Sequence, residues 1–99
     1  MQIAKVRGTV VSTQKEPSLE GTKFLLLQLI NAEGDLLPEY EVAADSVGAG
    51  IGEWVLFSRG SAARQQPGKE HRPLDALIIA IIDTVTVENS RIYNKRDAY

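Results

Sequence analysis

The glycine-rich segment at residues 45–52 is the part of the sequence that most suggests a chemical site, because glycines let backbone N–H groups approach an anion closely. Its three glycines, Gly48, Gly50 and Gly52, are spaced two residues apart. A dinucleotide-binding fingerprint needs its third glycine at position 53, where this sequence has Glu53, and no Gly-Lys-Ser/Thr triplet follows. The spacing therefore indicates a tight turn or a close backbone approach rather than a phosphate site.

Side chains suited to catalysis are few and scattered along the chain. The one histidine, His71, lies in a polar loop bounded by prolines, where a solvated role is the usual one. Asp75 and Asp83 would be roughly 26 Å apart on a straight strand, too far for a catalytic carboxylate pair. Ser61 has no histidine or lysine near it in sequence that would activate it as a nucleophile. We predict a protein that is not an enzyme and has no catalytic residues.

The composition also restricts cofactors and partners. The chain has no cysteine and no cluster of metal-ligating residues, so we expect neither a cofactor nor a metal. A net charge of −2 gives no general field to attract phosphate backbones. Lys5 and Arg7 interrupt the N-terminus where an export signal would be apolar, and the apolar run at residues 76–82 is much shorter than a membrane span of about 20 residues. We therefore predict no nucleic acid, no membrane and no dedicated small-molecule substrate.

The elements that position these residues are predicted to be strands. At 99 residues and 43% hydrophobic content, the chain has the size and the apolar material of one domain, residues 1–99. Apolar residues recur in five strand-like segments, at residues 4–10, 23–30, 38–44, 51–59 and 74–87. Within the third segment, Tyr40 and Val42 are predicted to point inward. Ser61 is placed to cap one short helical turn. The pattern predicts an all-β fold, a five-stranded oligonucleotide-binding-type (OB-like) barrel with at most one helical turn.

Two of these strands are apolar on both faces, which a small barrel does not need. Residues 23–30 carry three leucines on one face and Phe24, Leu26 and Ile30 on the other, and residues 51–59 show the same pattern. An antiparallel barrel normally wets the outer face of each strand, so we expect a neighbouring subunit or a returning tail to cover it. The segment at residues 74–87 would extend about 46 Å as one strand, beyond the roughly 34 Å diameter of such a domain. It must bend, or project and pair elsewhere.

A single-stranded nucleic-acid-binding module is the alternative that an OB-like barrel leaves open. Such barrels stack bases on aromatic side chains over a basic groove. In this sequence, Tyr40 and Trp54 are the aromatic side chains that would report such stacking, and only residues 91–99 are locally basic. The aromatic side chains lie in apolar strand contexts, which favours a core or interface role.

Several motifs resemble the CcmL/EutN family of bacterial microcompartment vertex proteins, over essentially the whole chain. Residues 1–15, MQIAKVRGTVVSTQK, resemble the family's opening strand. Residues 45–64, DSVGAGIGEWVLFSRGSAAR, are the most specific match, with a glycine loop, a Gly-Glu-Trp-Val run and a Gly-Ser-x-Ala-Arg run. Residues 88–96, ENSRIYNKR, are most similar to the tail of the cyanobacterial carboxysome members, and we take residues 88–99 as a C-terminal tail.

The resemblance implies a structural shell protein that assembles as a homopentamer at the vertices of a carboxysome shell. Its expected partners are four further copies of the chain and the hexameric shell proteins around it. Small residues let five chains converge near an axis. Candidate axis or interface residues are therefore Gly48, Ala49, Gly50, Gly52, Glu53, Gly60, Ser61 and Arg64. Candidate tail-interface residues are Arg91, Tyr93, Lys95 and Arg96.

Overall fold

Strands dominate the chain, as the apolar periodicity predicts. The computed structural model describes residues 1–13, 17–19, 21–60 and 76–97. In this part of the chain the elements are β1 (Gln2–Val10), the 3₁₀ turn η1 (Pro17–Leu19), β2 (Lys23–Ile30), β3 (Leu36–Asp45), β4 (Trp54–Arg59), β5 (Ala76–Ile81), β6 (Thr84–Val87), β7 (Ser90–Asn94) and the 3₁₀ turn η2 (Lys95–Asp97). The helical turn expected at Ser61 lies outside the described residues. No helix in these ranges is long and apolar enough to cross a bilayer.

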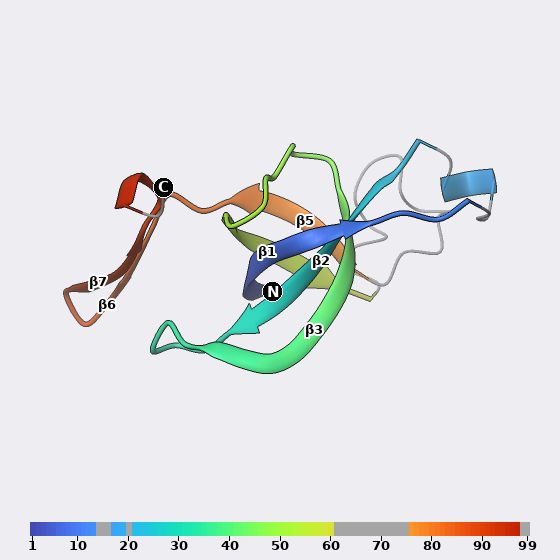
Figure 1. The fold of residues 1–99 in the computed structure, drawn as a ribbon. Coiled ribbons are helices and arrows are strands. Elements are labelled where there is room, and N and C mark those ends of the chain that lie inside the picture. Colours follow the sequence, from blue (N-terminus) through green and yellow to red (C-terminus); the bar gives the residue numbers. More distant parts are fainter. Residues whose placement is uncertain (14–16, 20, 61–75, 98–99) are drawn as a thin grey trace.

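Five of the strands close into a barrel in the order β1-β2-β3-β5-β4 (Figure 1). β1 pairs antiparallel with β2 on one side and with β4 on the other, which closes the sheet on itself. Among the described strands of the barrel, β3 and β5 form the one parallel pair, and the other pairs are antiparallel. The predicted all-β barrel of five strands is confirmed.

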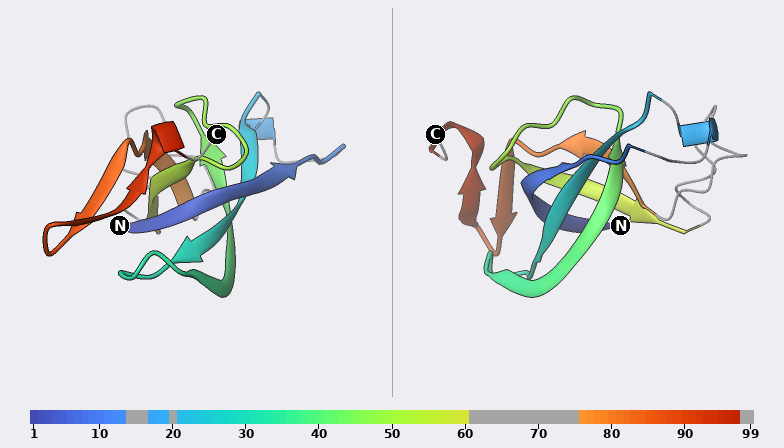
Figure 2. Two further views of the ribbon diagram at one scale, coloured as in Figure 1. Left: turned by 60° about the vertical axis from the view of Figure 1, so that its left-hand side comes forward. Right: turned by 45° about the vertical axis from the view of Figure 1, so that its right-hand side comes forward.

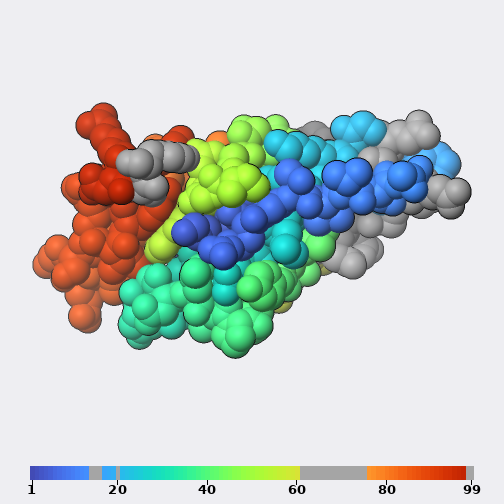
Figure 3. Space-filling model, in the orientation of Figure 1, coloured from blue at the N-terminus to red at the C-terminus, as the bar shows by residue number. Residues whose placement is uncertain are grey.

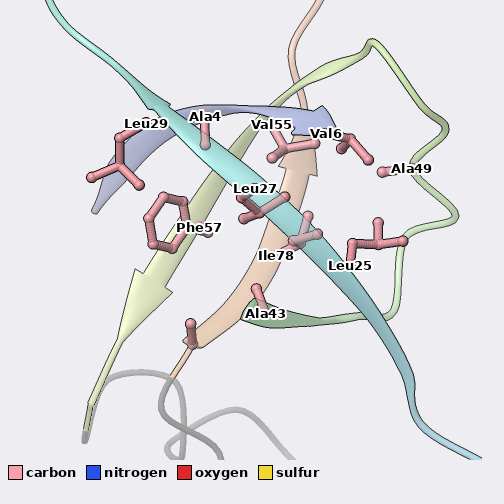
Figure 4. Close-up of a cluster of buried hydrophobic side chains, with 11 residues drawn as sticks. Ala4, Val6, Leu25, Leu27, Leu29, Ala43, Ala49, Val55, Phe57 and Ile78 are labelled. Carbon is pink, nitrogen blue, oxygen red and sulfur yellow. The ribbon is translucent and has the colours of Figure 1, made fainter. Parts of the chain in front are cut away.

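The core lies inside this barrel and is built by strict alternation along β2 and β4. Leu25, Leu27 and Leu29 of β2 point inward, as the leucine spacing predicts, and meet Val55 and Phe57 of β4 (Figure 4). Phe57 is fully buried. Because side chains alternate across a strand, the intervening residues of β2 and β4 must face outward.

The orientation predicted for β3 is wrong. Leu25 of β2 pairs with Ala43, and Leu26 pairs with Val42. Directly opposed residues share a face of the sheet, so the buried Ala43 points into the core and Val42 points out. Tyr40 and Val42 are 55% and 44% exposed. Hydrophobicity alone therefore misassigned this face, because β3 carries apolar side chains on its outer surface.

The long apolar run after residue 74 bends and then projects, as its length requires. β5 ends at Ile81, and after a break at residues 82–83 the chain continues as β6, which pairs only with β7 among the described strands. The β6–β7 hairpin stands beside the barrel (Figures 1 and 2) and forms one end of the molecule in the space-filling view (Figure 3). Its turn residues Glu88 and Asn89 have φ values of 48° and 68°, the left-handed geometry that joins two-residue hairpins. Part of the predicted tail is thus a paired strand.

Candidate functional site

The glycine-rich loop between β3 and β4 is held in shape by a carboxylate at its start. Asp45 Oδ1 accepts hydrogen bonds from the N–H groups of Val47 and Gly48, at 3.0 and 3.2 Å. Its Oδ2 accepts a third from the N–H of Ala49, at 3.0 Å. Ala49 itself is buried in the barrel core. Asp45 therefore acts as an internal anchor that folds the loop onto the end of the barrel.

Glu53 anchors the other end of the loop. Only 8% of this residue is exposed. Its Oε1 accepts a hydrogen bond from the Gly50 N–H at 2.6 Å, and its Oε2 lies 3.0 Å from Lys95 Nζ. The backbone adds two bonds to β1, from the Gly52 N–H to the Val6 carbonyl and from the Val6 N–H to the Glu53 carbonyl. The loop is thus tied to β1 and to the C-terminal segment at once.

These contacts determine what the glycines do. Gly48 and Gly52 have φ values of +79° and +88°, a region that L side chains rarely adopt. At Gly50, a Cβ would lie 3.3 Å from Glu53 Oε1. Each glycine therefore serves the local backbone, as a tight turn or a close approach requires.

The loop is not arranged to bind a phosphate. The N–H groups that a phosphate would use already donate to protein acceptors, at residues 47, 48, 49, 50 and 52. The carboxylates of Asp45 and Glu53 also place negative charge at the loop, which repels an anion. In addition, the described residues contain no group of three His, Cys, Asp or Glu side chains that could hold a metal ion.

The C-terminal hairpin covers the outer face of β4 at Trp54. Tyr93 of β7 stacks on Trp54 with ring centroids 4.2 Å apart and an interplanar angle of 14°. Ile30 and Ile82 complete this cluster, which lies outside the barrel core. For Trp54, the expected cover is therefore a returning segment of the same chain. The Tyr93 hydroxyl is buried and has no hydrogen-bond partner among the described residues.

Lys95 joins this hairpin to the glycine loop. Its N–H donates to the Asp83 carbonyl at 2.8 Å, and its side chain reaches Glu53. Arg91 and Arg96 are exposed and line a hollow with Asp83 and Lys95. The structure thus brings together Glu53 and Lys95, which the sequence placed in two separate candidate groups.

The remaining sequence candidates are distributed as follows. Gly60 follows β4 with a φ of +61°. Ser61, Arg64, His71 and Asp75 lie outside the described residues. The sequence reasoning missed the anchoring role of Asp45, although an aspartate followed by a glycine-rich turn is the usual signal for side-chain to backbone bonds of this kind.

Together these features define a class: a small OB-like barrel with a self-anchored loop and a hairpin packed on one outer face. The family model for the ethanolamine utilisation protein EutN/carboxysome group matches residues 1–83. The chain belongs to this EutN/CcmL family.

Individual relatives cover the chain almost completely. The carboxysome shell vertex protein CcmL of a Nostoc species is 70% identical over 100 residues, which is 100% of this chain and 99% of the relative. The solved structure of Gloeobacter violaceus CcmL has a TM-score of 0.94 at 69% identity and covers 98% of this chain and 100% of that one. GrpN, a pentameric microcompartment shell protein from Rhodospirillum rubrum, has a TM-score of 0.81 at 44% identity, covering 88% of this chain and 99% of its own.

Proposed function

We propose that this chain forms a homopentamer that occupies the vertices of a carboxysome shell, and so serves carbon dioxide fixation as a structural protein. The observation that carries the proposal is the match over the full chain to carboxysome shell vertex proteins, at 70% identity for the Nostoc relative. The barrel of the pentameric GrpN superposes on this one with a TM-score of 0.81. The proposal includes the absence of an enzymatic activity.

A vertex function needs geometry rather than catalysis. A flat layer of hexagonal tiles cannot close, and pentagonal tiles supply the missing curvature. A protein in that position needs a head-to-tail interface that closes on itself after five subunits. The exposed apolar residues Tyr40 and Val42 on the outside of β3 are the kind of surface that such an interface buries.

The rim of the pentamer is proposed to dock against hexameric shell proteins. The candidate axis or interface residues of the glycine loop, and the exposed Arg91 and Arg96 of the tail, stay predictions for contacts with neighbouring subunits or tiles. Tyr93 and Lys95 already have partners in their own chain, which favours an indirect role in positioning the loop.

Native mass spectrometry tests the pentamer directly. Because one chain has a mass of 10.8 kDa, we expect an assembly of about 54 kDa, five times that value. A stable monomer at micromolar concentration would overturn the proposal.

Deleting the gene from a carboxysome-forming host tests the vertex role. Without pentamers, shells should be elongated or open in electron micrographs, and re-expression of the chain should restore closed shells. Closed shells of normal shape in the deletion strain would contradict the vertex role even if the protein is pentameric.

Binding of single-stranded nucleic acid, the alternative function, is not supported by the relatives. Trp54 is buried against Tyr93 and has no face available to stack on a base. Tyr40 is exposed, so the test must follow both side chains. A titration with single-stranded oligonucleotide at low salt should leave the fluorescence of Trp54 and of Tyr40 unchanged.

A further inference from the structure

We propose that the ring closes through two different apolar surfaces of the barrel, which we call the meander surface and the closure surface. The meander surface of each chain docks on the closure surface of the next chain. The meander surface consists of Gly8, Leu26, Tyr40 and Val42 on β1, β2 and β3. The closure surface consists of Ile3, Leu56, Ala80 and Val85 on β1, β4, β5 and β6. This inference rests on the proposed homopentamer and assigns the surfaces that form it.

The meander surface is a continuous row across three strands. Gly8 pairs with Leu26, and Leu26 pairs with Val42, so these residues lie side by side on the outer face. Tyr40, opposite Gln28, extends the row by one position. Leu26, Tyr40 and Val42 line a hollow together with Glu41. The chain's own hairpin does not reach this face, since it packs on Trp54 at another part of the barrel.

Gly8 is the feature that points to another chain at this surface. A Cβ at this position would meet no atom within 4 Å, and the residue does not have a positive φ. The register shifts between Val6 and Gly8, but an irregularity without positive φ does not require glycine. A glycine inside a strand weakens it, and it is typical where another backbone approaches closely. Within the described residues nothing approaches Gly8, which favours a neighbouring chain as the source of the second backbone.

The closure surface is a second apolar row on a different part of the barrel. Ile3 pairs with Leu56, and Leu56 pairs with Ala80. Ile3 and Leu56 line two adjoining hollows, one that extends to Met1 and Leu37 and one that extends to Val85 of the hairpin. Ile3, Leu56 and Val85 also pack against the cluster of Trp54 and Tyr93 and are half-buried. The hairpin therefore covers part of this surface, and the two hollows are what a neighbouring chain would fill.

The positions of the two surfaces select a second copy of this chain as the occupant. Both surfaces include β1, but Ile3 lies near its start and Gly8 near its end, and the surfaces extend from β1 in opposite directions around the barrel. They therefore cannot cover each other within one chain. A self-complementary surface would give a twofold dimer and leave the other surface exposed, whereas two different surfaces give a head-to-tail contact that forms a ring. The fold of the pentameric GrpN agrees with such a ring.

Mixing two variants distinguishes a head-to-tail contact between two different surfaces from a twofold contact through one surface. Val42→Lys places a charge in the meander surface, and Ala80→Lys places one in the closure surface. Each variant alone should be monomeric by native mass spectrometry. An equimolar mixture should give a heterodimer, because the intact closure surface of Val42→Lys can bind the intact meander surface of Ala80→Lys, and growth must stop there. If either variant stays pentameric, or if the mixture contains only monomers, the pairing of these surfaces is wrong.

A third variant separates folding from assembly. Gly8→Val fills open space with a residue that favours strands, so its melting temperature should be equal to or higher than that of the monomeric Val42→Lys variant, which has also lost the stabilisation from assembly. The same side chain should block the neighbour's approach and abolish the pentamer. Val87→Lys is the matched control for the two lysine variants. It changes an apolar position near the hairpin tip that is 37% exposed, and it should leave the pentamer intact. A pentameric Gly8→Val would overturn the role given to Gly8.

The unmodified chain keeps the two proposals distinguishable. If it is monomeric, the proposed pentamer fails and the surfaces lose their purpose. If it is pentameric and the variants are pentameric as well, the pentamer stands and only the assignment of surfaces is overturned.

Discussion

Replacing Tyr93 tests how firmly the hairpin is fixed to the barrel. Only 7% of Tyr93 is exposed, and its ring stacks on Trp54 at 4.2 Å. Burying an aromatic side chain removes about 150–250 Å² from water, or about 4–6 kcal/mol at ~25 cal/mol per Å². Because the hairpin can relax into part of the space, we expect Tyr93→Ala to lower the free energy of unfolding by about 3–5 kcal/mol. Tyr93→Phe keeps the ring and removes a buried hydroxyl that has no partner among the described residues, so its effect should be within about 1 kcal/mol.

Fluorescence provides the assay, because Trp54 is the sole tryptophan of the chain. Guanidinium unfolding of both variants gives the two free energies, and the emission maximum of the folded state reports whether Trp54 is still covered. Tyr93→Ala should shift this emission to the red, and Tyr93→Phe should not. If Tyr93→Phe costs as much as Tyr93→Ala, the hydroxyl has a partner, and the reasoning about its burial is refuted.

The remaining predictions concern the glycine loop and an ion pair between β3 and β4. Asp45→Ala removes the acceptor of three N–H groups and should cost about 2–3 kcal/mol, seen by calorimetry as a lower melting temperature; an unchanged value would rule out the anchor. Gly48→Ala forces a Cβ into a φ of +79° and should cost about 1–2 kcal/mol in chemical unfolding, whereas a neutral result would show that the loop relaxes freely. Glu41→Gln breaks an ion pair with Arg59, whose side chain is 48% exposed while that of Glu41 is 26% exposed, so its cost should stay below about 1 kcal/mol in the same assay; a larger loss would mean that the pair is shielded from water.

The strand periodicity predicted the barrel because most of its evidence is local. Each strand can be predicted from its own residues, because side chains alternate across a strand whatever its neighbours are. This holds for the leucines of residues 23–30 and for the apolar pattern of residues 51–59. The break in the run at residues 74–87 was also predictable, since its length alone exceeds the domain. The glycine loop was correctly predicted to be a turn, because Glu53 stands where a dinucleotide fingerprint needs its third glycine and no Gly-Lys-Ser/Thr triplet follows.

The errors and omissions come from information that one strand does not contain. Tyr40 and Val42 were placed inside because apolar side chains usually are, but the register of β3 against β2 decides their face, and register depends on both strands. The contact between Glu53 and Lys95 joins residues 42 positions apart and has no local signal. The stacking of Tyr93 on Trp54 was missed for the same reason, because an apolar outer face does not state what covers it.

The strand order has a consequence for when each surface comes into existence. β1, β2 and β3 are consecutive and pair with their sequence neighbours, so the meander surface needs only contacts between nearby segments. The closure surface exists only after β1 has paired with β4, a contact between residues about 50 positions apart that forms slowly. An incompletely folded chain therefore offers one half of the proposed contact and can add to a growing ring without letting it close. Closure of the proposed ring would then act as a check on folding, since it would require five chains whose barrels are all complete.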